Sequence, residues 1–138
     1  MLEFTIDKNK DINILIVDSN RTFAGIIKET LGKYLKNQNN VDICTNVWEL
    51  KRRLNGDSPY NIILADISVA CDGDAMAQEL NKTKTPVIAW TTYSKEKLKN
   101  IIPSNYLNHC KVIKKPGTSV EINKALSLIT NSVPALVA

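Results

Sequence analysis

The sequence contains no hydrophobic run long enough to cross a membrane. A membrane-spanning helix needs ~18 or more consecutive apolar residues, and the apolar residues, although they make up 43% of the 138-residue chain, are interrupted by polar ones throughout. The first eleven residues alternate charged and apolar side chains and lack the apolar block of a signal peptide. We therefore expect a soluble, cytoplasmic protein that does not contact a membrane.

Cysteine and histidine are also scarce. The three cysteines, Cys44, Cys71 and Cys110, are spread along the chain without paired spacing, which argues against a disulfide framework and against a zinc site. The single histidine, His109, cannot form a metal site alone and is interpreted as a surface loop residue. A glycine-rich phosphate loop of the Gly-x-x-x-x-Gly-Lys type is missing, so the sequence does not predict a nucleotide-binding site.

Neither sign of charge dominates the chain. The 18 lysines and arginines against 14 acids give a net charge of +4, which is far from the footprint of a nucleic-acid-binding protein. Between Lys95 and Lys115, however, Glu96 is the only acid, and the basic residues there are Lys95, Lys97, Lys99, Lys111, Lys114 and Lys115. This excess predicts a basic surface that recruits an acidic protein partner rather than nucleic acid; a merely solvated charged face is the alternative.

Short apolar runs alternate with amphipathic segments along the chain. Apolar runs typical of strands occupy residues 12–17, 41–45, 60–66, 86–91 and 111–114. Helical patterns follow them at about residues 19–36, 46–54, 74–81, 94–102 and 118–129, and the expected capping residues are Ser19, Asn46 with Glu49, Ser94, and Thr118 with Glu121. Five strand–helix units predict an α/β fold, a doubly wound parallel sheet with helices on both faces. We assign one domain to residues 12–130, with an N-terminal extension (1–11) and a C-terminal tail (131–138).

Polar residues stand where four of these strands end. The first strand is followed by Asp18, the third ends at Asp66, the fourth ends at Thr91 and the fifth is followed by Lys115. Because the carboxyl ends of parallel strands meet at one edge of the sheet, we expect these side chains to converge there, where ligands bind in such folds. Each also has a simpler structural interpretation, since the acids can cap helices, Thr91 can end a strand and Lys115 can be a solvated turn residue.

The chain resembles the receiver domain of two-component response regulators from Ile12 to about Ile129. The resemblance is carried by Ile14–Asp18, by Ile63–Ile67 with the later Asp72-Gly73, by Pro86–Thr91, and by Lys115-Pro116. It implies a flavodoxin-like sheet with strand order 2-1-3-4-5. It also implies that Asp66 accepts a phosphoryl group from a histidine kinase or a histidine phosphotransfer protein. In such domains Asp18 belongs to the acidic pocket, Thr91 is the hydroxyl that moves to the phosphoryl group, and Lys115 is the ion-pair partner.

The expected chemistry requires positive charge near the acceptor. A carboxylate that attacks phosphorus brings several anionic oxygens together, so a divalent cation and a lysine must offset their repulsion. The resemblance implies that Mg²⁺ is held by Asp18, Asp66 and the backbone carbonyl of Ser68. Receivers usually carry a second acid where this chain has Ser19. A hydroxyl is a poorer magnesium ligand than a carboxylate, so we expect a partly degenerate pocket and weak magnesium binding.

Two functions remain open from the sequence. The first is a phosphoacceptor switch whose enzymatic activity is at most self-catalysed phosphorylation and dephosphorylation of Asp66, and which signals through changed docking. The alternative is a pseudo-receiver that binds a protein partner without phosphorylation, and Ser19 is the feature that divides the two. We expect a monomer or a weak dimer, whose downstream partner binds the basic face of the fourth helix and fifth strand.

Overall fold

Five parallel strands form the centre of the fold. The structure is a computed structural model, and it describes residues 13–33, 40–54, 60–68, 73–94, 96–97, 100 and 110–131. The strands are β1 (Ile14–Val17), β2 (Val41–Cys44), β3 (Ile62–Asp66), β4 (Val87–Thr91) and β5 (Cys110–Lys114). The helices are α1 (Arg21–Leu31), α2 (Val47–Arg53), α3 (Gly73–Asn81) and α5 (Ser119–Asn131). The predicted extension, most of the predicted tail and most of the predicted fourth helix lie outside the described residues.

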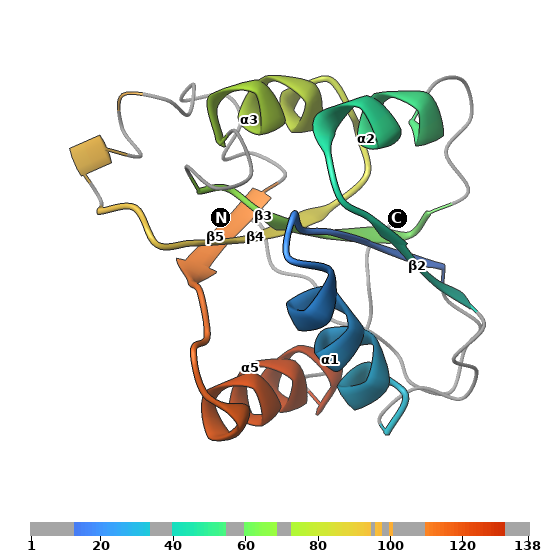
Figure 1. Cartoon of the computed structure of the whole chain (residues 1–138), viewed down its shortest axis with the longest axis vertical. Helices are drawn as coiled ribbons and strands as arrows, with labels where there is room; N and C mark the ends of the chain where they lie inside the picture. Colours follow the sequence, from blue (N-terminus) through green and yellow to red (C-terminus); the bar gives the residue numbers. More distant parts are fainter. Residues whose placement is uncertain are drawn as a thin grey trace.

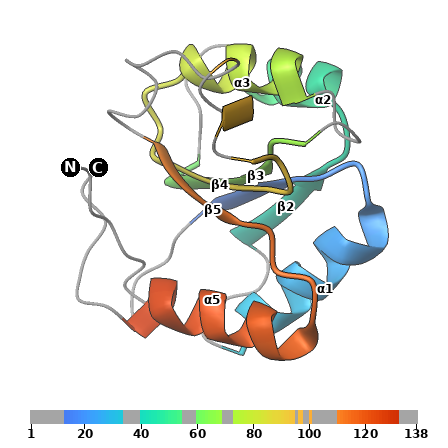
Figure 2. The same ribbon diagram turned by 90° about the vertical axis from the view of Figure 1, so that its left-hand side faces the viewer.

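The strand order is β2-β1-β3-β4-β5, and every neighbouring pair is parallel. Helices α1 and α5 cover one face of the sheet, and α2 and α3 cover the other (Figures 1 and 2). The predicted doubly wound sheet, its order and its two helical layers are therefore confirmed. In the part of the chain that the structure describes, no helix has the length and apolar character that a membrane crossing requires.

The inner strands are buried on both faces, which explains their nearly continuous apolar sequences. All residues of β1, β3 and β4 are buried. One core cluster lies beneath α2 and α3 and includes Leu50 and Leu80, and the other lies beneath α1 and α5 and includes Ile27 and Leu126. Because two layers of side chains hold the sheet, the strand ends are fixed in position and can support a precise site.

The first helix begins and ends differently from the prediction. Its N-cap is Asn20, whose side-chain oxygen accepts a hydrogen bond from the Phe23 amide at 3.0 Å, and not Ser19. The reason is local: the Asp18 carboxylate accepts the Asn20 amide at 2.8 Å, which keeps the chain extended for one further residue. The helix ends at Leu31 with Gly32 as the C-cap, shorter than the predicted end near residue 36.

The other predicted caps are confirmed. Asn46 accepts the Glu49 amide at 2.9 Å, and Thr118 accepts the Glu121 amide at 3.1 Å. In the fourth helical segment the Lys97 amide donates to the Ser94 hydroxyl at 3.2 Å, which is the contact expected of a serine N-cap.

Candidate functional site

The strand register places the two predicted carboxylates beside each other. Val17 of β1 pairs with Ala65 of β3, so the next residues, Asp18 and Asp66, lie at the same level of adjacent strands. Each of these residues is only 1% exposed. Two buried carboxylates that face the same edge repel each other, and a cation must compensate them.

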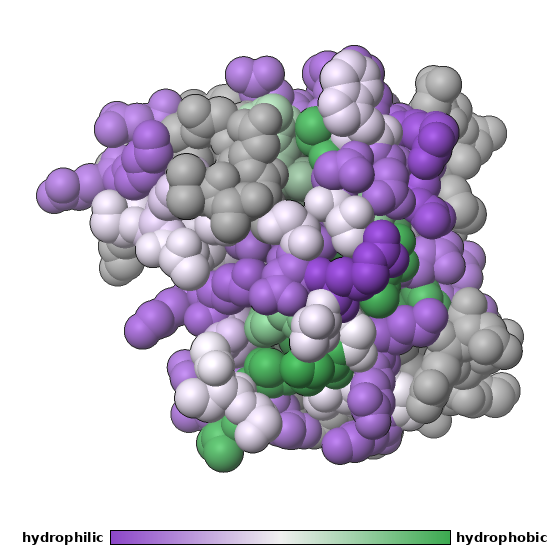
Figure 3. Space-filling view, viewed as in Figure 1, coloured by the Kyte–Doolittle hydropathy of each residue, from purple (hydrophilic) through white to green (hydrophobic). Residues whose placement is uncertain are grey.

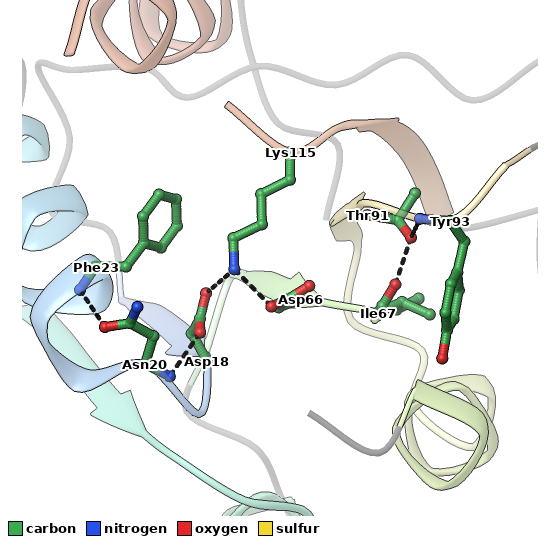
Figure 4. A network of polar contacts seen from close by, with 8 residues as sticks. All are labelled: Asp18, Asn20, Phe23, Asp66, Ile67, Thr91, Tyr93 and Lys115. Atoms are coloured by element: carbon green, nitrogen blue, oxygen red, sulfur yellow. Dashed lines mark hydrogen bonds and ion pairs between the residues drawn. The ribbon is translucent and has the colours of Figure 1, made fainter. Parts of the chain in front are cut away.

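Lys115 supplies that cation. Its Nζ donates to Asp66 Oδ2 at 2.6 Å and to Asp18 Oδ2 at 3.1 Å, and its own side chain is 18% exposed (Figure 4). β4 lies between β5 and β3, so the Lys115 backbone is about two strand spacings, or roughly 10 Å, from that of Asp66. A long side chain is therefore needed at this position, and lysine meets the requirement with three donors and a compact charge.

Burial and the ion pairs alter the proton affinities of the site. Burial raises the pKa of Asp18, an effect that the hydrogen bonds from the Asn20 amide and Lys115 oppose and the neighbouring Asp66 charge reinforces. Burial alone would lower the pKa of Lys115, but the hydrogen bonds to Asp66 and Asp18 outweigh it and raise the pKa above its ordinary value of 10.5. Lys115 is therefore a firmly charged group between the two acids.

Thr91 lies at the same edge of the sheet, but its hydroxyl bonds backbone groups and not the two acids. The hydroxyl donates to the carbonyl oxygen of Ile67, the residue after Asp66, and accepts the Tyr93 amide at 2.9 Å (Figure 4). It is 4% exposed. The structure thus places Thr91 beside the backbone that follows Asp66 and records no direct bond from its hydroxyl to Lys115 or either carboxylate.

The two serines of the predicted metal site lie in different environments. Ser68 is buried, with 4% exposure, two residues after Asp66, whereas Ser19 is exposed directly after Asp18. Among the described residues no group of three or more acidic, histidine or cysteine side chains could hold a metal ion. The hard donors predicted for this site are the carboxylates of Asp18 and Asp66, which the structure brings together, and the backbone carbonyl of Ser68, two residues after Asp66.

These donors fit magnesium in type, and their small number suits an ion that keeps several waters. Two carboxylates face one ammonium in a buried site, and this excess of acidic side chains favours a small cation. Magnesium prefers oxygen ligands and keeps several waters, so two carboxylates and a carbonyl are a sufficient protein contribution. A third carboxylate, which would strengthen binding, is not among the described neighbours of this pair.

One contact of the site was not anticipated from the sequence. The ring of Phe23, a residue of α1, has its centroid 4.5 Å from Lys115 Nζ. Its apolar spacing along the helix indicates only that it faces inward. Because Lys115 follows Phe23 by 92 positions in the sequence, helical periodicity contains no signal for this contact.

The predicted basic surface is described only in part. Lys97 and Lys114 are exposed, and so is Glu96. The side chains of Lys95, Lys99 and Lys111 lie outside the described residues. On the face that Figure 3 shows, hydrophilic side chains form a band between the two helical layers.

Comparison with solved structures identifies the fold. A response regulator from Hahella chejuensis is 17% identical with a TM-score of 0.65, covering 87% of this chain and 92% of that one. A two-component response regulator from Clostridium difficile is 19% identical with a TM-score of 0.61, covering 88% and 98%. The Francisella response regulator 1452 receiver domain is 20% identical with a TM-score of 0.59, covering 87% and 97%. Neither a protein-family profile nor a curated protein sequence matches the chain.

The chain therefore has the fold of response-regulator receiver domains, as its sequence predicted. Identities of 17–20% establish the fold alone. The roles of Asp18, Asp66, Ser68, Thr91 and Lys115 must be argued from the geometry of the site.

Proposed function

We propose that this chain is a signalling receiver that accepts a phosphoryl group on Asp66. The observation that carries the proposal is the contact of Lys115 Nζ with both Asp66 and Asp18 at the carboxyl edge of the sheet. A structural cap or a strand terminus requires no such arrangement of two buried carboxylates around one ammonium. The donor is a histidine kinase or a histidine phosphotransfer protein, which are the partners of the resembling domains.

The chemistry follows from the groups present. The Asp66 carboxylate attacks phosphorus, the bond from phosphorus to the donor imidazole breaks, and an acyl phosphate forms on Asp66. Lys115 is already hydrogen-bonded to Asp66 and can follow the charge as it moves onto the phosphoryl oxygens. Asp18, Asp66 and the Ser68 carbonyl would hold a magnesium ion. When bound, this ion would offset the repulsion between the carboxylates and the incoming oxygens.

Thr91 provides a route from the site to the surface. Its hydroxyl bonds the Ile67 carbonyl and the Tyr93 amide, so a hydroxyl that turned toward a phosphoryl group would release both. Tyr93 in turn lies near Lys97, whose Nζ is 5.7 Å from the ring centroid. We infer that phosphorylation changes the surface around Tyr93 and Lys97, where a downstream protein docks.

Phosphorylation is tested by intact mass after incubation with acetyl phosphate and magnesium. The wild type should gain one phosphoryl group, and Asp66→Asn should gain none. Asp42→Asn is a matched control, because Asp42 is a half-exposed carboxylate on β2 that bonds Tyr60 rather than Lys115. Full incorporation by Asp66→Asn would show that the acceptor lies elsewhere.

A phosphorylation-independent interaction module is the second candidate function. It is favoured by the exposed Ser19 at the position of the usual second acid and by the two-carboxylate pocket. In that case wild-type protein takes no phosphoryl group at any magnesium concentration, and Asp66→Asn binds the downstream partner as tightly as the wild type.

A further inference from the structure

The ammonium of Lys115 contacts an aromatic ring as well as two carboxylates. Its Nζ lies 4.5 Å from the centroid of the Phe23 ring, which Figure 4 shows beside the end of the lysine side chain. Two further cation–ring contacts occur among the described residues, Lys51 to Trp48 and Lys97 to Tyr93, at 5.8 and 5.7 Å. The Phe23 contact is the shortest of the three and involves the most buried of these ammonium groups, and such contacts strengthen as water is excluded.

A second aromatic residue holds the Phe23 ring in place. The ring meets Trp90 edge to face, with centroids 5.8 Å apart and planes at 88°. Trp90 is fully buried in β4 and packs in the same core cluster as Leu126 of α5. Edge-to-face pairs are a preferred aromatic geometry, so Trp90 restricts the orientation that Phe23 can present to the ammonium.

An aromatic face suits this position chemically. It attracts the positive charge but carries no lone pair that competes with a carboxylate or a phosphoryl oxygen for the N–H donors of the lysine. An oxygen-bearing side chain there would withdraw a donor from the acids. The ring can therefore fix the ammonium laterally and leave its donors directed at the reacting groups.

We propose that Phe23, supported by Trp90, is a positioning residue that holds the Lys115 ammonium over Asp66 and Asp18 for phosphoryl transfer. The proposal rests on the proposed function of the site. It gives the first helix a role in the chemistry, whereas the sequence pattern of this helix indicates only packing.

Three variants separate positioning from packing. Phe23→Leu removes the ring and keeps an apolar side chain, and Phe23→Tyr keeps the ring. If the leucine variant does not fold, Phe23→Met takes its place, because the flexible methionine side chain also removes the ring and adapts to the space. Trp48→Leu is the control, because it removes an exposed cation–ring contact on α2. The rate of phosphorylation by acetyl phosphate should fall about fivefold to tenfold in Phe23→Leu and be restored in Phe23→Tyr. Trp48→Leu should match the wild type.

A second readout does not depend on phosphorylation. In the wild type, the ε-methylene protons of Lys115 should show an upfield ring-current shift in the nuclear magnetic resonance spectrum. This shift should disappear in Phe23→Leu and persist in Phe23→Tyr. If the wild type accepts no phosphoryl group, the proposed function fails, while the presence of the shift still supports the positioning of Lys115. A folded Phe23→Leu or Phe23→Met protein with the wild-type rate, or a wild type without the shift, would overturn the inference.

Discussion

The hydroxyl of Thr91 donates to the carbonyl oxygen of Ile67, the residue that directly follows Asp66. The same hydroxyl accepts the amide of Tyr93, so one side chain links the end of β3 to the segment after β4. This link gives the hydroxyl residue at the end of β4 a structural role of its own.

Replacing Thr91 with alanine should therefore destabilise the protein. The change leaves a buried carbonyl and a part-buried amide without the hydroxyl, which should lower the free energy of unfolding by about 1–3 kcal/mol. Thr91→Ser keeps the oxygen and should lose less than half of that amount. Urea denaturation measures both, and equal losses in the two variants would show that the missing methyl group, not the hydroxyl, matters.

Removing the cation from the acidic pair should have a pH-dependent effect. At pH 7, Lys115→Met should lower the free energy of unfolding by about 3 kcal/mol, because two buried carboxylates lose the ammonium that they share. Burial already raises the pKa of Asp18, so the variant should recover stability as acidification neutralises one carboxylate. Urea denaturation at about pH 4.5 and at neutral pH tests this expectation.

In the wild type, the stabilising effect of the Lys115 ion pairs should be lost at high pH. The pKa of Lys115 is raised above 10.5, so the contribution of the ion pair is complete below pH 10.5 and is lost as the pH rises through the folded value. The difference between wild type and Lys115→Met should therefore shrink in alkali. Lys114→Met, a change at the neighbouring exposed lysine, is the control and should follow the wild type at every pH.

Adding an acid at position 19 should tighten magnesium binding. Ser19 is exposed directly after Asp18, and a carboxylate there would raise both the charge and the number of hard ligands. Calorimetry should show about tenfold or greater tightening in Ser19→Asp. Asn61→Asp adds the same charge at the opposite end of the sheet, before β3, and should leave the affinity unchanged. Equal affinities for wild type and Ser19→Asp would place residue 19 away from the metal.

The thiol of Cys44 should be inert in the folded protein. Burial, with a smaller effect of the Glu49 charge, raises its pKa to about 12. A maleimide reagent at neutral pH should therefore modify Cys44 only after denaturation, in a protein whose Cys71 and Cys110 have been changed to serine. Rapid labelling under native conditions would mean that the end of β2 opens readily.

Charge reversal at the described part of the basic surface tests docking. Lys97→Glu combined with Lys114→Glu should weaken binding of an acidic protein partner and abolish its salt dependence. Lys82→Glu combined with Lys84→Glu changes two exposed lysines after α3 and shifts the net charge by the same amount, so this pair is the control. A double variant that binds its partner as the wild type does would leave these lysines with a solubilising role only.

Sequence reasoning was successful where local chemistry decides the structure. Apolar runs located the strands, and strand ends in a parallel sheet must share an edge, so the meeting of Asp18, Asp66 and Lys115 followed from order alone. The predicted N-cap, Ser19, was wrong. The Asp18 carboxylate accepts a hydrogen bond from the Asn20 amide, so the helix begins one residue later, with Asn20 as its N-cap. The direction of the Thr91 hydroxyl and the contact of Phe23 with Lys115 depend on rotamers and on distant strands. Neither the direction of the Thr91 hydroxyl nor this contact can be predicted from a periodic pattern in the sequence.

The ion pair between Lys115 and Asp18 joins residues 97 positions apart. Such a contact closes a loop that contains nearly the whole sheet, and closing a long loop costs conformational entropy. The strands within the loop must therefore pair first and offset this cost before the ammonium can reach the acids. The site should thus be among the last features to form during refolding, after β3 and β4 have paired. In a stopped-flow experiment, the proposed transfer of a phosphoryl group to Asp66 should become possible only after Trp90 is buried, so this transfer would report completed folding.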